Sequence, residues 1–158
     1  MYGDKGTRNA IFILKMLSER MIDVQKDIYM CFIDYQKAFD NVRHKELFEL
    51  LKEIGMDGKD WRLLKHLYWN QSAALRFGGE LSGWVQIEKG VRQGCVMSPD
   101  LYNIYSEAIM DSIRGKEGIS VGGVNINNIR YADDTTLLAE SENSLQDMMD
   151  TIVENSEA

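Results

Sequence analysis

Three carboxylates stand where their chemistry depends on how the chain folds. Asp34 follows an apolar run, whereas Asp133 and Asp134 stand side by side between two short apolar stretches. Like charges held close together repel, so such a cluster needs a cation. Magnesium takes oxygen ligands, usually a couple of carboxylates plus substrate phosphates, and two such ions can clamp the reacting oxygens of a phosphoryl transfer. The residues therefore allow a two-metal phosphotransfer site if the two segments are neighbours, whereas the adjacent pair alone indicates only a polar hairpin turn.

The segments that carry these carboxylates are predicted to be strands. Residues 28–33 (IYMCFI) have the length and composition of a strand buried on both faces, and Asp34 follows its end. Residues 129–138 (IRYADDTTLL) indicate a strand, the two aspartates and a second strand. A short hairpin through two glycines is predicted over 119–124, and a final helix is predicted from about residue 145.

Further elements are predicted around this region. Apolar residues at helical spacing predict a helix over 9–21, with Thr7 as its N-cap. Ser98 followed by Pro99 predicts another helix start, with the serine as N-cap and the proline as the first helical residue. This helix is expected to run to about residue 114.

The middle of the chain predicts two helices and a hairpin. Apolar positions over 47–54, ended by Gly55, mark one helix, and those over 61–68, begun near Asp57 or Gly58, mark the next. Strands over 73–77 and 84–88 are expected to pair across Gly78-Gly79. Helices mixed with hairpins indicate the α+β class.

Composition bounds the class of protein. The chain has 158 residues, which suits one domain or a piece of a larger one, and 44% of them are hydrophobic. No apolar stretch is long enough to cross a membrane and no N-terminal pattern suggests secretion, so no membrane partner is expected. Cys31 and Cys95 lack metal-ligand spacing and are expected to be reduced thiols of an intracellular protein. The sequence does not distinguish nucleus from cytoplasm.

The net charge of −7 argues against a broadly basic, nucleic-acid-binding surface. This argument is limited, because binding needs only one local basic strip and metal-holding carboxylates add to the negative total.

Three motifs in order carry a resemblance to a known family. They are residues 32–40 (FIDYQKAFD), 90–103 (GVRQGCVMSPDLYN) and 131–134 (YADD). The last motif alone would be weak, but the ordered set with its long loop-to-helix element is highly specific. The chain resembles a reverse transcriptase, an RNA-directed DNA polymerase, of the non-LTR (LINE-like) retrotransposon type.

The resemblance implies roles for the carboxylates and their cofactor. Asp34 would be the first catalytic aspartate and would bridge two Mg²⁺ ions, for which Mn²⁺ is the alternative. Asp133 would be the second metal ligand, and Asp134 the less directly coordinating member of the triad. The backbone carbonyl of Tyr35 would complete the shell of one metal.

The resemblance also implies substrate contacts. Phe39 would abut the sugar 2′ position and exclude ribonucleotides, and Gln93 and Gly94 would line the incoming nucleotide and the template base. Lys5 and Arg8 would meet the triphosphate. The implied reaction joins a deoxynucleoside triphosphate (dNTP) to the 3′-hydroxyl of a DNA primer on an RNA template.

The same resemblance implies a right-hand polymerase fold. Residues 1–27 would be a remnant of the fingers, and 28–158 a palm with an antiparallel ferredoxin-like sheet and packed helices. Fingers-side helices and a hairpin would be inserted in this palm. The chain is expected to be a fragment that stops after the 131–134 hairpin, without the thumb and endonuclease regions that normally share the polypeptide. An open sheet edge and exposed apolar surface are expected.

Each motif has a simpler alternative interpretation. Phe39 could be a core residue, Gln93-Gly94 an ordinary loop, and the three tryptophans packing residues. Two hypotheses from different classes follow: the catalytic palm of a reverse transcriptase, or a non-catalytic remnant that acts as a binding or fold fragment. A metal-dependent phosphatase or cyclase with a similar palm is a third, but the 90–103 element has no role there.

Overall fold

The chain divides into two compact units, within each of which the residues pack together. The computed structural model describes residues 7–131 and 133–157. Unit 1 comprises Met1–Gln36 and Ile109–Ala158, and unit 2 comprises Lys37–Ala108. Within the described residues every strand pair is antiparallel and helices accompany the strands in both units, which confirms the predicted α+β class. No helix among these residues is both long and apolar enough to cross a bilayer.

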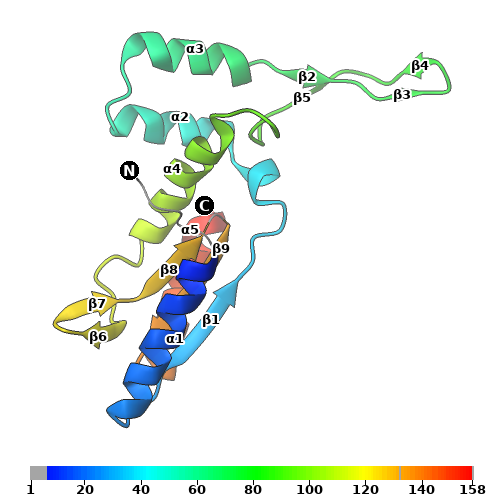
Figure 1. The fold of residues 1–158 in the computed structure, drawn as a ribbon. Helices are drawn as coiled ribbons and strands as arrows, with labels where there is room; N and C mark the ends of the chain where they lie inside the picture. The colour runs from blue at the N-terminus through cyan, green and yellow to red at the C-terminus, as the bar shows by residue number, and fades with distance from the viewer. Residues whose placement is uncertain (1–6, 132, 158) are drawn as a thin grey trace. The chain divides into compact units, whose positions relative to one another are not determined.

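Three antiparallel strands form the main sheet of unit 1 (Figure 1). Their order is β1 (Tyr29–Ile33), β9 (Asp134–Ala139) and β8 (Asn128–Tyr131), so β9 is the central strand. Every β9 residue after Asp134 is buried, whereas Phe32 of β1 is 70% exposed. The predicted strand before Asp34 is confirmed, but the expectation that it is buried on both faces is wrong, because β1 lies at the edge of the sheet.

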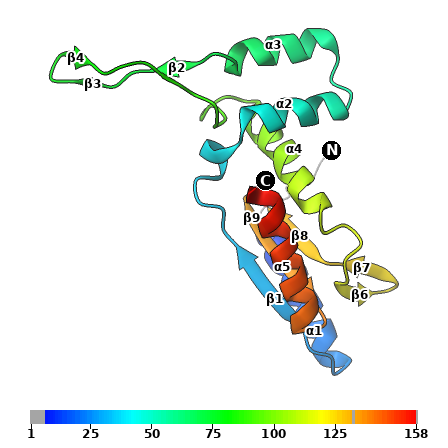
Figure 2. The same ribbon diagram turned by 180° about the vertical axis from the view of Figure 1, so that it is seen from behind.

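Two helices cover opposite faces of this sheet, as Figures 1 and 2 show from opposite sides. They are α1 (Thr7–Asp23) and α5 (Glu142–Glu157). Met21 of α1 shares a buried cluster with Leu138, and Met148 of α5 shares another with Leu137. Since consecutive strand residues point to opposite faces, these two leucines identify an α1 face and an α5 face of the sheet.

The observed ends of α1 and α5 agree only partly with the ends predicted from the sequence. Both predicted helices are confirmed, and α1 begins at Thr7, whose side chain lies outside the described ones. The helix α5 begins earlier than predicted, at Glu142, because the Ser141 hydroxyl accepts a hydrogen bond of 3.1 Å from the backbone N–H of Ser144.

A second, two-stranded hairpin belongs to unit 1. It pairs β6 (Ile119–Val121) with β7 (Val124–Ile126) across Gly122-Gly123, as predicted. Both turn glycines have positive φ, which suits the tight turn between two antiparallel strands.

Two helices build the core of unit 2, α2 (His44–Glu53) and α3 (Gly58–Tyr68). The predicted stop at Gly55 is confirmed, because this residue has φ of +84° and its N–H bonds to the carbonyl of Lys52. The predicted start of α3 is confirmed as well, since the Asp57 side chain accepts a hydrogen bond of 2.9 Å from the Lys59 N–H.

The hairpin of unit 2 is broken into short pieces. These are β2 (Ser72–Ala73), β3 (Arg76–Phe77), β4 (Glu80–Leu81) and β5 (Val85–Gln86). Ala73 pairs with Val85 but Arg76 pairs with Leu81, so one strand carries an extra residue between these pairs. The predicted hairpin is confirmed, but its two continuous strands are not, because this bulge interrupts the ladder.

The helix α4 (Ser98–Asp111) begins in unit 2 and ends in unit 1, and its start differs from the prediction. The Leu101 N–H bonds to the carbonyl of Met97, so Met97 holds the cap position and Ser98 is already helical. The buried Ser98 hydroxyl instead donates a 2.6 Å hydrogen bond to the carbonyl of Arg92. The expected N-cap role of Ser98 is therefore wrong, because its hydroxyl fastens the preceding loop.

Candidate active site

Asp34 and Asp134 meet at one end of the β1–β9 pair. The last register pair of these strands joins Ile33 to Thr135, so one further step along the register sets Asp34 against Asp134. Register partners lie on the same face, and Met30 with Leu138, four residues away, places both aspartates on the α1 face. Both aspartates are exposed. The strand adjacency that the sequence required is present.

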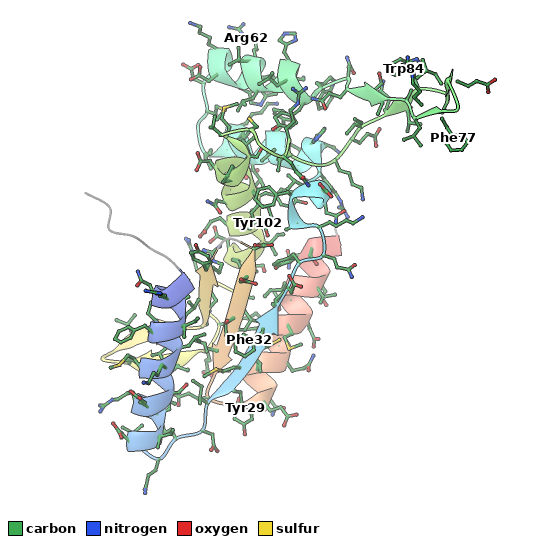
Figure 3. The ribbon with its side chains drawn as sticks, turned by 45° about the vertical axis from the view of Figure 1, so that its right-hand side comes forward. Tyr29, Phe32, Arg62, Phe77, Trp84 and Tyr102 are labelled. Atoms are coloured by element: carbon green, nitrogen blue, oxygen red, sulfur yellow. The ribbon has the colours of Figure 1, made fainter. Side chains whose placement is uncertain are left out.

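A hollow of about 290 Å³ lies beside these two carboxylates. Asp34 and Asp134 form its charged side, and its other lining residues come from α1 and the three strands. Most of these are apolar or aromatic (Ala10, Ile11, Leu14, Phe32, Ile33, Ile129 and Tyr131), and the remaining two are Thr135 and Thr136. Figure 3 shows Phe32 on β1, where its ring remains 70% exposed. The aspartates thus stand at the edge of an apolar hollow that solvent can enter.

Asp133 lies in the turn that joins β8 to β9 and is half-buried. Its predecessor in the YADD motif, residue 132, lies outside the described residues. Asp133 directly precedes Asp134, which is the first residue of β9 and pairs with Tyr131 of β8. The two adjacent aspartates therefore lie at the same end of the sheet, with Asp134 in the strand and Asp133 in the turn before it.

The donor set fits a hard divalent cation. Asp34 and Asp134 offer carboxylate oxygens from one face, and magnesium usually takes one or two carboxylates together with waters and substrate phosphates. Across residues 7–131 and 133–157, no group of three or more His, Cys, Asp or Glu side chains is gathered closely enough to hold a metal. The protein part of the site thus presents a carboxylate pair, with Asp133 in the adjoining turn.

Tyr35 follows Asp34 and sends its side chain to the α5 face. Its ring packs against the buried cluster that includes Met110 and Met148. The Tyr35 hydroxyl is buried and has no hydrogen-bond partner among the described residues. Burial raises the pKa of this phenol, and the positive charge of Arg130 opposes that rise. The predicted metal contact uses the backbone carbonyl of Tyr35, which is independent of this hydroxyl.

Phe39 belongs to unit 2 and stacks on Tyr102. It lies in the short 3₁₀ helix η1 (Ala38–Asn41), and the two ring centroids are 4.9 Å apart at an interplanar angle of 24°. Tyr102 is buried and Phe39 is half-buried, so one side of the Phe39 ring is backed by the core. A ring supported in this way suits the predicted steric role, and the packing interpretation holds at the same time.

Gln93 and Gly94 lie in a loop that is tied to the segment of Phe39. The Val91 N–H bonds to the Phe39 carbonyl at 2.8 Å, and the Gln93 amide donates to the Asp40 carboxylate at 3.3 Å. Gly94 has φ of +81° and its Cα borders open space, so backbone is accessible there. The structure therefore brings Phe39, Gln93 and Gly94 together within unit 2.

Asp40 is a residue that sequence reasoning missed. Its carboxylate accepts the hydrogen bond from Gln93. Its backbone packs against Gly90, where an added Cβ would lie 3.2 Å from the Asp40 carbonyl oxygen. The FIDYQKAFD motif contains Asp40, but no local spacing links it to a loop some fifty positions later.

Of the two residues predicted to contact the triphosphate, the structure describes only Arg8. Arg8 is exposed in the first turn of α1. Lys5 lies outside the described residues.

Comparisons with known proteins agree with these motifs. A family profile described as reverse transcriptase (RNA-dependent DNA polymerase) matches residues 6–158. A Pol polyprotein of the retrotransposable element R2 from Nasonia vitripennis is 28% identical over 143 residues, which are 90% of this chain and 14% of that protein. The RNA-directed DNA polymerase of the mobile element jockey from Drosophila funebris is 32% identical over 130 residues, 78% of this chain and 14% of that protein.

A solved structure shares the fold. The chain of an apo telomerase from Candida tropicalis, truncated from its C-terminal domain, superimposes with a TM-score of 0.62 at 14% identity. The match covers 94% of this chain and 31% of that one. The chain thus spans only a small part of the relatives that it matches.

Proposed function

Because this chain belongs to the reverse transcriptase (RNA-dependent DNA polymerase) family, we propose that it forms the nucleotidyl-transfer centre of a retrotransposon RNA-directed DNA polymerase. The proposed reaction joins a dNTP to the 3′-hydroxyl of a DNA primer paired to an RNA template. The observation that carries this proposal is the β1–β9 register, which sets Asp34 and Asp134 on one face at one end of the sheet.

In this proposal Asp34, Asp133, Asp134 and the carbonyl of Tyr35 hold two Mg²⁺ ions. When bound, such ions lower the pKa of an attacking hydroxyl and stabilise the charge on a leaving pyrophosphate. The protein's contribution is to fix the carboxylates on a hydrogen-bonded strand end, so that their geometry changes little during reaction. Phe39, backed by Tyr102, would exclude a ribose 2′-hydroxyl, and Gln93 with Gly94 would line the nucleotide.

The proposed function also assigns the parts of the fold. Unit 1 would be the palm, with residues 1–27 as a remnant of the fingers, and α2, α3 and the β2–β5 hairpin of unit 2 would be inserted fingers-side elements. The sheet would correspond to the antiparallel, ferredoxin-like palm sheet of right-hand polymerases.

Primer extension on an RNA template with magnesium tests this function. The chain would be compared with its Asp133→Ala variant, each alone and followed by a thumb segment from an R2 relative. DNA made by the extended wild type and not by the extended variant would support the proposal. If the extended wild type makes no DNA, the polymerase function fails and the non-catalytic remnant becomes the better account. Activity only in the extended form would identify the chain as a palm that needs its thumb.

A further inference from the structure

Two tryptophans and two lysines of unit 2 alternate along one surface. The Lys52 ammonium lies 4.8 Å from the centroid of the Trp61 ring. The Lys65 ammonium lies 4.6 Å from Trp61 and also 4.6 Å from Trp69. Lys65 therefore stands between two indole rings, within the range of cation–π attraction. These four residues are called the Lys–Trp strip below.

The core of unit 2 holds the tryptophans of this strip in place. The Trp61 indole N–H donates a 3.2 Å hydrogen bond to the carbonyl of Phe48, and the Phe48 ring meets Trp61 edge-on. Trp69 also meets the Phe48 ring, at a centroid distance of 6.2 Å. Trp69 nevertheless keeps 45% of its surface exposed. Part of this indole is therefore open to solvent, beside the Lys65 ammonium.

The cations around the strip have no acidic partner. Lys52, Lys59, Arg62 and Lys65 make no ion pair within the described residues. Arg62 projects from the open side of α3, as Figure 3 shows, and lies three residues from both Lys59 and Lys65. Residues three apart are neighbours on a helix, so α3 presents a local row of positive charge in a chain whose net charge is −7.

A hollow of about 550 Å³ adjoins Trp69 in the same unit. Its lining includes three cationic residues, Arg43, Lys45 and Lys89, and two acidic ones, Glu46 and Glu88, besides Tyr68 and Trp69. Arg43 is paired with Glu46, whereas Lys45 is exposed and makes no ion pair in the described chain. The exposed indole therefore borders a space large enough for a nucleobase, and Lys45 is an exposed cation in the mixed-charge lining of that space.

We propose that the Lys–Trp strip, with Lys59 and Arg62, is a docking surface for single-stranded RNA. Unpaired cations attract the phosphate backbone, and an exposed indole stacks on a base whose face is free. Duplex RNA keeps its bases stacked on one another, so it cannot use Trp69 in this way. The choice of RNA rests on the proposed function, in which an unpaired stretch of template RNA accompanies the enzyme.

The first test measures binding of a labelled single-stranded RNA 12-mer by fluorescence anisotropy at several salt concentrations. The variant Arg62→Gln with Lys65→Gln is compared with Lys15→Gln plus Arg20→Gln, which removes two exposed cations of α1. The slope of log K against log salt should become shallower by about 1.4 in the α3 variant, at about 0.7 per lost phosphate contact. The α1 variant should keep the wild-type slope. Equal slopes in the two variants would overturn the proposal.

The second test addresses stacking. Trp69→Ala should weaken RNA binding by at least about fivefold, while Trp69→Phe retains most of the affinity. Trp84→Ala is the matched control, since Trp84 is 70% exposed but lies on the β2–β5 hairpin away from any lysine contact. An equal loss in Trp84→Ala, or none in Trp69→Ala, contradicts the proposed platform. Thermal melts of each variant show whether the fold is kept.

Competition binding and the variant Asp34→Asn together distinguish RNA docking from catalysis. Duplex RNA should compete less well than single-stranded RNA, because its stacked bases leave no free face for Trp69, and equal or tighter binding of the duplex overturns the proposal. Single-stranded DNA of the same sequence should compete about as well as RNA, since both present phosphates and free base faces, and tighter binding of DNA than of RNA overturns the choice of RNA. Asp34→Asn should leave RNA binding unchanged while removing primer extension. RNA binding that depends on the strip, together with no primer extension by the thumb-extended wild type, would contradict the polymerase function alone.

Discussion

Asp34 and Asp134 occupy one face and one end of an antiparallel strand pair, because the last residues paired before them are Ile33 and Thr135. Two carboxylates from segments a hundred residues apart are thereby fixed by backbone hydrogen bonds rather than by side-chain contacts. Their mutual repulsion is the property that a divalent cation relieves. The first prediction follows from this repulsion.

Magnesium should stabilise the wild-type chain against heat, and Asp34→Asn should abolish that effect. At ten times the dissociation constant, a bound ion adds about 1.4 kcal/mol to the free energy of unfolding. Without metal the Asn variant should be at least as stable as wild type, since one of two like charges is gone. Thermal melts with and without Mg²⁺ measure both effects. Asp27→Asn, an exposed change before β1, should respond to Mg²⁺ like wild type.

Phe39→Val should relax the selection of sugar. The smaller side chain leaves room for a 2′-hydroxyl, and steric differences of this size change discrimination by roughly 10- to 200-fold. The ratio of ribonucleotide to deoxynucleotide incorporation in primer extension is the measurement. Phe39→Tyr keeps a ring stacked on Tyr102 and should retain the wild-type ratio. An unchanged ratio in the valine variant would leave Phe39 as a packing residue only.

Tyr35→Phe should stabilise the fold. The Tyr35 hydroxyl is buried without a hydrogen-bond partner in the part of the chain that the structure describes, and an unsatisfied buried hydroxyl costs about 1–3 kcal/mol. Its removal should therefore raise the free energy of unfolding by about 1 kcal/mol in urea titrations. Tyr29→Phe, at the surface on β1, should change the unfolding free energy by less than about 0.5 kcal/mol. A destabilised Tyr35→Phe would show that the hydroxyl has a partner in solution.

Acid should weaken the fold partly through Glu140. A hydrogen bond from Lys26 at 2.7 Å, followed by one from the Ser120 N–H, holds the pKa of the Glu140 carboxyl below its usual range. A folded-state pKa below the unfolded value of 4.5 means that this stabilisation is present above pH 4.5 and is lost as the pH falls through the folded pKa. Glu140→Gln should flatten the stability profile in that window.

The exposed Glu154 provides a matched control for this pH effect. Glu154→Gln should leave the dependence of unfolding on acid as it is in wild type. Lys26→Gln should reproduce most of the flattening seen in Glu140→Gln, because it removes the same ion pair and leaves only the hydrogen bond from the Ser120 N–H. A Lys26 variant that keeps the wild-type profile would assign the effect to other groups.

Local patterns predicted the elements well because their causes are local. Gly55 at +84° and Asp57 with its capping carboxylate both act within one turn of their own helices. The same holds for the turn glycines of the hairpins. The YADD motif and its partner motifs identified the candidate site because they are conspicuous in the chain itself.

Features that depend on distant partners could not be predicted. Whether β1 is central or at the edge depends on its pairing with β9, which lies about a hundred residues later in the chain. The apolar run of β1 does not indicate which position it takes. The bulge of the unit 2 hairpin, where residues 82–84 face only residues 74–75, is apparent only when the two strands are aligned. Ser98 looked like a cap, but the carbonyl of Arg92 competes for its hydroxyl through a loop conformation that spacing does not encode.

The burial of β9 also has a kinetic consequence. Its residues from Thr135 to Leu137 are buried and paired with a neighbouring strand on both sides, so their backbone amides should exchange hydrogen only when unit 1 opens as a whole. Asp134 is the residue at which this protection ends. The carboxylate therefore stands at the border between the slowest part of the backbone and freely accessible solvent, where a reactive group can be both stationary and wet.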